Sequence, residues 1–154
     1  MKIEIIPFDP KYSADFKNLN LDWLNKYFRV EAHDDEILGY PEKNIIKPGG
    51  NIFFAREGKR ILGTVALMKI EDNVFELTKM AVTPQEQGKK TGQKLMEHTL
   101  EFAKEKGWKT LILYSNRKLE SAIYIYKKYG FEEIPLEDNG PYGRGDIKMK
   151  LDIS

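Results

Sequence analysis

The segment 83–94 joins an apolar, strand-like run to a segment with helical spacing, and it reads Thr-Pro-Gln-Glu-Gln-Gly-Lys-Lys-Thr-Gly-Gln-Lys. Gly88 and Gly92 lie where backbone N–H groups point outward, and Lys89 and Lys90 add positive charge. Converging N–H groups at a helix N-terminus bind anions, because the unpaired donors and the helix dipole act together. The loop therefore predicts a pyrophosphate site, although a solvated basic turn would have the same composition.

Two common nucleotide-binding motifs do not fit this loop. A Walker motif needs Ser or Thr directly after Gly-Lys and a second Gly five positions before the first. Here Lys90 follows Gly88-Lys89, and Thr83 occupies the earlier position. The dinucleotide fingerprint needs three glycines at a fixed spacing that the segment lacks. Nucleotide hydrolysis is therefore disfavoured.

The length of 154 residues is typical of one domain, so we expect residues 1–154 to form a single unit. Lys and Arg number 25 against 24 Asp and Glu, which leaves a formal net charge of +1. This balance gives no global field that would attract nucleic acid or an anionic membrane. With no cysteine and two histidines, the chain offers no disulfide, no cysteine nucleophile and no thiolate or histidine-rich metal site.

The first residues, 1–7, alternate like a strand and do not resemble a secretion signal. No apolar stretch approaches the roughly 18 residues of a membrane-spanning helix. The lack of cysteine fits a reducing compartment. We therefore predict a cytoplasmic protein without a metal cofactor.

The spacing of apolar residues predicts a mixed order of strands and helices. We expect strands at 2–7, 51–56, 61–70, 74–82, 110–114, 131–134 and 146–153, long helices at 12–28, 91–106 and 119–130, and a short helix with loops in 31–48. Ser13 is a candidate N-cap, and Gly107 is a candidate C′ glycine. The expected fold class is α/β, or α+β in some schemes: one mixed, mostly antiparallel sheet of six or seven strands flanked by helices.

This order of elements, with the basic loop and a segment ending in Tyr-Lys-Lys-Tyr-Gly-Phe, resembles the GCN5-related N-acetyltransferases (GNAT) over nearly the whole chain. The family's loop pattern is Arg or Gln, two residues, Gly, one residue, then Gly or Ala. It maps onto 87–92, with Lys90 in place of the middle glycine. The run 75–82 resembles the family's fourth strand, and 115–131 its distal strand, helix and strand. The opening 19–50 also resembles acetyltransferase domains of bacterial helix-turn-helix regulator fusions, without the regulator domain.

The resemblance implies that acetyl-CoA is the co-substrate and that an acetyl group is transferred to a primary amine of a small molecule or peptide. The loop amides from Gly88 to Gly92 would hold the pyrophosphate, and the backbone of Met80 and Val82 would pair with the pantetheine arm. The residues implied to bind the coenzyme are Met80, Ala81, Val82, Gln87, Gly88, Lys89, Lys90, Thr91, Gly92, Gln93, Asn116 and Tyr126.

The resemblance also implies three catalytic residues. Glu76 is the candidate base, directly or through water, the N–H of Met80 would polarise the thioester carbonyl, and Tyr126 would donate to the leaving sulfur. The alternative for Glu76 is a strand-edge or solvent-facing glutamate without a catalytic role. The alternative for Tyr126 is an ordinary core tyrosine, because it shares an apolar stripe with its helix neighbours. Asn116 would serve equally as a ligand of the coenzyme or as a cap for the next helix.

The acceptor is not fixed by the sequence. In similar enzymes the first helices and the last hairpin border the acceptor, which makes Arg29, Glu31, Asp34, Tyr142 and Arg144 the candidates for contacting it. A noncatalytic acyl-CoA sensor with the same fold is the alternative function. A homodimer is compatible with the sequence.

Overall fold

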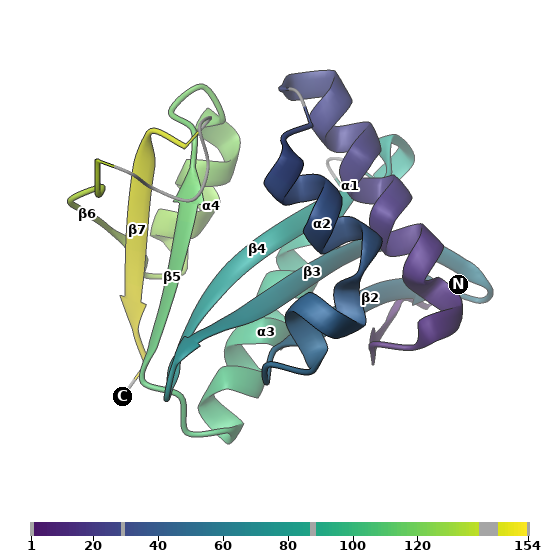
Figure 1. Ribbon diagram of the computed structural model, residues 1–154, viewed down its shortest axis with the longest axis horizontal. Coiled ribbons are helices and arrows are strands. Elements are labelled where there is room, and N and C mark those ends of the chain that lie inside the picture. The colour runs from purple at the N-terminus through teal and green to yellow at the C-terminus, as the bar shows by residue number, and fades with distance from the viewer. Residues whose placement is uncertain (1, 29, 87–88, 139–144, 154) are drawn as a thin grey trace.

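The structure is a computed structural model, and it describes residues 2–28, 30–86, 89–138 and 145–153. The chain forms a seven-stranded mixed sheet in the order β1-β2-β3-β4-β5-β7-β6, as the predicted fold class requires (Figure 1). The strands are β1 (Glu4–Pro7), β2 (Asn51–Glu57), β3 (Arg60–Glu71), β4 (Val74–Val82), β5 (Thr110–Ser115), β6 (Glu132–Ile134) and β7 (Ile147–Asp152). The α-helices are α1 (Ser13–Tyr27), α2 (Ala32–Gly39), α3 (Thr91–Glu105) and α4 (Glu120–Lys128), and short helical turns occupy Pro10–Tyr12, Glu42–Ile46 and Pro84–Glu86.

Helices cover both faces of the sheet (Figure 1). On one face, α1 and α2 bury a core that includes Phe16, Leu38 and Phe54. On the other face, α3 and α4 bury a second core that includes Leu95 and Leu113. Successive residues of a strand point to opposite faces, so Phe53 and Phe54 enter different cores. The apolar runs of the central strands follow from burial on both sides.

The strands β2, β3 and β4 form an antiparallel meander. The next pair, β4 and β5, is parallel and short: the register joins Val74 to Thr110, Phe75 to Leu111 and Glu76 to Ile112. Beyond these pairs the two strands separate, and Figure 1 shows them diverging from a common end. The carboxyl-terminal half of β4 therefore has an edge that β5 does not cover.

A β-bulge lies in this half of β4. The register with β3 steps from Thr64–Ala81 to Ala66–Thr78, so two residues of β4 stand opposite Val65 alone. One of the two, Lys79, has a φ of +54°, a left-handed conformation that is uncommon for a residue other than glycine. The bulge bends the strand at the point where it leaves β5.

The predicted helix boundaries are partly confirmed. Gly107 follows α3 with a φ of +72°, as a C′ glycine does. Ser13 is not an N-cap, because the preceding Pro10–Tyr12 turn already points the chain into the helix and Ser13 is its first residue. Among the described helices, none combines the length and the hydropathy of a membrane-spanning segment.

Candidate functional site

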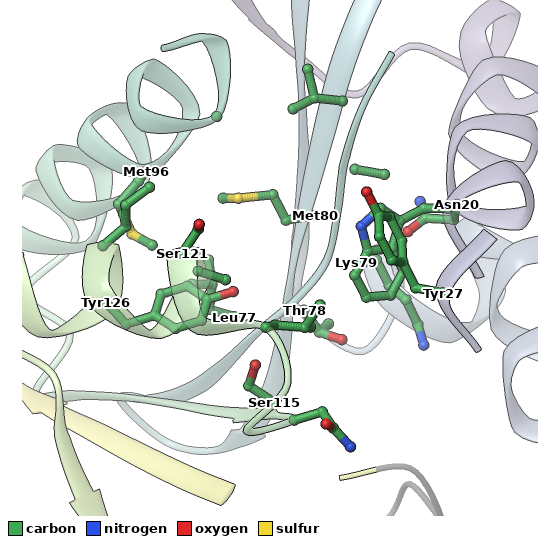
Figure 2. Close-up of a pocket in the computed structure, with 18 of the residues that line it drawn as sticks. Asn20, Tyr27, Leu77, Thr78, Lys79, Met80, Met96, Ser115, Ser121 and Tyr126 are labelled. Atoms are coloured by element: carbon green, nitrogen blue, oxygen red, sulfur yellow. The ribbon is translucent and has the colours of Figure 1, made fainter. Parts of the chain in front are cut away.

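One cavity of about 830 Å³ lies where β4 and β5 separate, and α1, α3 and α4 complete its walls. This volume is in the usual range of small-molecule sites, about 300–1,000 Å³. Figure 2 shows Met80 near its middle, with Tyr126 and Met96 on one side and Asn20, Tyr27 and Lys79 on the other. The cavity thus runs from the N-terminus of α3 to the C-terminal half of α1.

The end of the cavity at α3 has the features of an anion site. Lys90, Thr91, Gly92 and Gln93 line it, and the first turn of α3 contains no acidic residue. The first N–H groups of a helix have no partner within the helix, so those of residues 91–93 are available to a ligand. The N–H of Lys89 is not available to a ligand, because it donates to the carbonyl of Glu86 at 3.1 Å. Gln87 and Gly88, both predicted to bind the coenzyme, lie outside the described residues.

Lys90 is the N-cap of α3 and has a φ of +67° and a ψ of 13°. This left-handed conformation explains why glycine is usual at this position of the predicted loop pattern, since a Cβ disfavours it. The chain keeps the turn with a lysine and places an additional cation beside the helix N-terminus. The departure from the pattern therefore adds strain to the turn.

A carboxylate already occupies part of this end. The Thr91 hydroxyl donates to Glu86 Oε1 at 3.1 Å, and Lys89 Nζ lies 3.8 Å from Glu86 Oε2. Gln93 is also held, because its Oε1 accepts from Lys128 Nζ at 3.3 Å and from the Tyr129 hydroxyl at 3.4 Å. These contacts link the loop and α3 to the end of α4.

The middle of the cavity follows the uncovered edge of β4. The described lining residues of this strand run from Leu77 to Val82 and include the bulge. An unpaired strand edge offers N–H and C=O groups to any extended chain that carries amides. The predicted residues Met80, Ala81 and Val82 all lie on this edge.

Tyr126 reaches the same place from α4. Its ring packs edge-on against Phe131, with centroids 6.0 Å apart, and its hydroxyl points into the cavity in Figure 2. Within the described part of the chain the hydroxyl has no hydrogen-bond partner. Burial raises the pKa of Tyr126 to about 12, so the hydroxyl keeps its proton at neutral pH and can donate a hydrogen bond.

Glu76 is 5% exposed and belongs to the face of β4 that α1 and α2 cover. It lies one residue before the strands separate, and it is not among the described residues that line the cavity. Asn116 does line the cavity, and its Oδ1 accepts from the N–H of Lys118 at 3.0 Å. The Asn116 side chain therefore shapes the turn that leads into α4.

Asp34 and Glu31 form the start of α2. The Glu31 N–H donates to Asp34 Oδ2 at 3.0 Å, and Asp34 Oδ1 accepts from Lys79 Nζ at 2.9 Å. The predicted acceptor candidate Asp34 is thus bound to the bulge of β4. The other candidates, Arg29, Tyr142 and Arg144, lie outside the described residues.

The far end of the cavity was not anticipated from the sequence. Trp23, Tyr27 and Phe28, at the end of α1, line it and contact one another, with Trp23 5.4 Å from Tyr27 and 5.5 Å from Phe28 between ring centroids. Lys118 crosses from the loop before α4: its Nζ donates to the Tyr27 carbonyl at 2.8 Å and lies 4.1 Å from the centre of the Phe28 ring. We call these four residues the aromatic end.

A family model described as an acetyltransferase (GNAT) domain matches residues 48–133, which is more than half of the chain. The chain belongs to the GNAT acetyltransferase family. The match runs from before β2 into β6, and it includes both the predicted loop and Tyr126. The resemblance drawn from the sequence is confirmed.

Curated relatives of this GNAT chain carry N-acetyltransferase names. An uncharacterized N-acetyltransferase of Schizosaccharomyces pombe is 27% identical over 150 residues, which cover 94% of this chain and 91% of the relative. The uncharacterized N-acetyltransferase YjgM of Escherichia coli is 36% identical over 115 residues, which cover 75% of this chain and 60% of the relative.

Solved structures confirm the GNAT fold. A GNAT acetyltransferase of Staphylococcus aureus superposes with a TM-score of 0.88 at 24% identity, covering 99% of this chain and all of the other. The PaiA N-acetyltransferase of Thermoplasma acidophilum, solved in complex with coenzyme A, has a TM-score of 0.75 at 21% identity and covers 99% of both chains. Among the described residues of this GNAT chain, no group of three His, Cys, Asp or Glu side chains could hold a metal ion.

Proposed function

We propose that this GNAT acetyltransferase transfers the acetyl group of acetyl-CoA to a primary amine in the cavity between β4 and β5. One observation carries the proposal: a single cavity joins the N-terminus of α3 to the β4 bulge and the Tyr126 hydroxyl. The pyrophosphate would lie against the N–H groups of residues 91–93, because these donors and the helix dipole favour an anion. Lys90 would add a mobile positive charge.

The pantetheine arm would extend along the uncovered edge of β4. Its amides can pair with backbone groups of the strand as a peptide would. This path leads from the α3 end past Val82 and Ala81 to Met80, near the middle of the cavity. The thioester would then lie between the bulge and Tyr126.

In the reaction, the neutral amine attacks the thioester carbonyl carbon, a C–N bond forms and the C–S bond breaks. The amine loses a proton and the departing thiolate gains one, so the products are an N-acetylated amine and CoA. The N–H of Met80 would stabilise the oxyanion, because it lies in the bulge and has no ladder position opposite β3. Tyr126 would donate a hydrogen bond to the sulfur as negative charge develops there.

Glu76 would act as the base through water. Its position on β4, one residue before the cavity opens, supports a relayed proton transfer and argues against direct contact with the amine. We also propose a cytoplasmic location, which fits the absence of cysteine, and no nucleic-acid or membrane partner, which fits the net charge of +1. A homodimer stays a prediction that sedimentation of the purified protein would check.

The test has two parts. Coenzyme A should raise the melting temperature of the protein, and thiol release from acetyl-CoA should depend on added amine across amino acids, polyamines, aminoglycosides and peptides. A protein that binds the coenzyme but releases no thiol with any amine would instead be the noncatalytic sensor. A protein that does neither would refute the assignment of the cavity.

A further inference from the structure

We infer that the acceptor is an amine that also carries a carboxylate on an apolar or aromatic body, as a free apolar amino acid does. The inference rests on the proposed function and concerns the half of the cavity that the coenzyme would leave open. That half consists of the aromatic end and the neighbouring Asn20 of α1.

Asn20 supplies a group for the amine. Its side chain is 3% exposed and lines the cavity, and its Nδ2 donates to the Phe16 carbonyl at 2.9 Å. This bond fixes the orientation of the amide and leaves Oδ1 as an acceptor to which the described residues donate no hydrogen bond. Asn20 lines the cavity, so a ligand can reach this oxygen there. An N–H of an acceptor amine would donate to it.

An amide oxygen also suits the chemistry of the amine. A carboxylate in this position would raise the pKa of the amine and hold it as the unreactive ammonium. A neutral oxygen binds the uncharged amine without that effect. Asn20 can therefore orient the nucleophile in the form that attacks the thioester.

The aromatic end supplies a surface for the body of the acceptor. The Trp23, Tyr27 and Phe28 rings form a contiguous wall, and aromatic walls favour apolar and aromatic groups. In the sequence alone, the spacing of these three aromatic residues is typical of a helix face that packs into a core. Their place in the cavity wall gives them a ligand-facing surface.

Lys118 supplies a group for the carboxylate. One of its three N–H donors binds the Tyr27 carbonyl, and its ammonium lies over Phe28, so the head group is held at the aromatic end. Among the described residues no carboxylate pairs with it. The remaining donors can bind an acceptor carboxylate at the rim of the aromatic wall.

The charges of the cavity also disfavour a polycationic acceptor. The described acidic lining residues are Glu86, before α3, and Glu120, at the start of α4. The stretches that surround the acceptor, from α1, β4 and the loop after β5, add no acidic side chain to this lining. They add the cation of Lys118, whereas the charge of Lys79 is compensated by Asp34. A polyamine would therefore meet like charge where it needs acidic partners.

The inference is tested by initial rates of thiol release from acetyl-CoA with four amines: L-phenylalanine, its amide, 2-phenylethylamine and spermidine. We expect kcat/KM for phenylalanine to exceed that for each of the other three by about tenfold or more, because a charge-assisted hydrogen bond is gained. Lys118→Met should reduce this preference by about tenfold, and Lys118→Arg should keep most of it. Lys104→Met, on the exposed surface of α3, is the matched charge control and should keep the preference.

Each other outcome has a defined meaning. Equal or faster acetylation of the three carboxylate-free amines overturns the inference and leaves the proposed function standing. A preference for phenylalanine that Lys118→Met does not change overturns it as well, because Lys118 would then not bind the carboxylate. Coenzyme binding without turnover of any amine, or no melting shift with coenzyme A, is a failure of the proposed function, and the inference then fails with it.

Discussion

Lys79 Nζ lies 2.9 Å from Asp34 Oδ1, and the two side chains are 3% and 0% exposed. The pair joins the bulge of β4 to the first turn of α2 and so fixes the strand conformation on which the cavity depends. Loss of one member removes this ion pair and leaves the other charge buried, and such a loss costs about 3–5 kcal/mol.

We therefore expect Lys79→Met to lower the free energy of unfolding by about 3 kcal/mol or more. The double variant Lys79→Met with Asp34→Leu should recover much of that loss, since the uncompensated charge is gone. Chemical denaturation of the two single variants and the double variant checks this. Additive losses in the double variant would show that the two side chains are not coupled.

Gly92 offers a test of the coenzyme loop that does not disturb the fold. A Cβ added at this position would meet its nearest described neighbour, Val82 Cγ2, at 3.7 Å, an ordinary contact. Gly92→Ala should therefore fold with unchanged or slightly higher stability, because alanine favours a helix by about 0.5–1 kcal/mol over glycine. If the pyrophosphate approaches the helix here, the methyl group will raise the KM for acetyl-CoA about tenfold or more.

The matched control for this variant is Gly39→Ala, because Gly39 also has room for a Cβ and belongs to α2 away from the loop. It should leave the KM for acetyl-CoA unchanged. An unchanged KM in Gly92→Ala as well would place the pyrophosphate elsewhere.

Lys90 is expected to be a strained residue. A left-handed residue other than glycine costs about 1–2 kcal/mol relative to its helical conformation, so Lys90→Gly should stabilise the protein by about 0.5–1 kcal/mol. Lys94→Gly is the comparison, because Lys94 lies within α3 and gains nothing from glycine. Thermal unfolding at matched pH measures both, and equal effects would remove the strain at residue 90.

Tyr126→Phe should lower kcat by about ten- to a hundredfold without changing the fold, because a hydrogen bond to a developing thiolate is worth about 1.5–3 kcal/mol. Tyr124→Phe is the matched control: Tyr124 is on the same helix, is 71% exposed and does not line the cavity. Full turnover in a folded Tyr126→Phe enzyme would exclude the donor role.

The same variant has a defined pH dependence. A tyrosine loses its proton above its pKa, and burial raises that of Tyr126 to about 12. The protonated donor is therefore present throughout the range of about pH 6–10. The pH profiles of the wild-type and Tyr126→Phe enzymes should have the same shape and differ only in height. A high-pH limb that disappears in the variant would show that Tyr126 titrates within that range.

The sequence predicted the elements with strong periodicity and clear ends. The run 74–82 matches β4 to the residue, because turn residues and the glycine loop bound an apolar strand. The bulge within it was not predictable, since a lysine gives no sign in the sequence that it adopts a left-handed conformation. The turn at Glu42–Ile46 was also not predictable from the sequence, because a π-helical turn has no local sequence pattern.

The site was predictable where it depends on local sequence and not where it depends on tertiary packing. Of the predicted coenzyme residues at the start of α3, Lys90 to Gln93 line the cavity, and Tyr126 does so from α4. Their roles stay predictions. The aromatic end combines residues that are 91 positions apart, Tyr27 and Lys118. No periodic pattern connects them, and three aromatic residues on a helix are typical of a core.

The short pairing of β4 with β5 has a mechanical consequence. Three residue pairs at one end join the strands β1 to β4 to the strands β5 to β7. Beyond these pairs no described ladder resists a change in the angle between the two parts of the sheet. A pantetheine arm hydrogen-bonded along the uncovered edge of β4 would lie between the two parts as an added strand does, and it would set the angle between them. Binding of the coenzyme would then also fix the relative position of the two parts of the sheet. Backbone amides along the uncovered edge of β4 would exchange with deuterium faster without the coenzyme than with it.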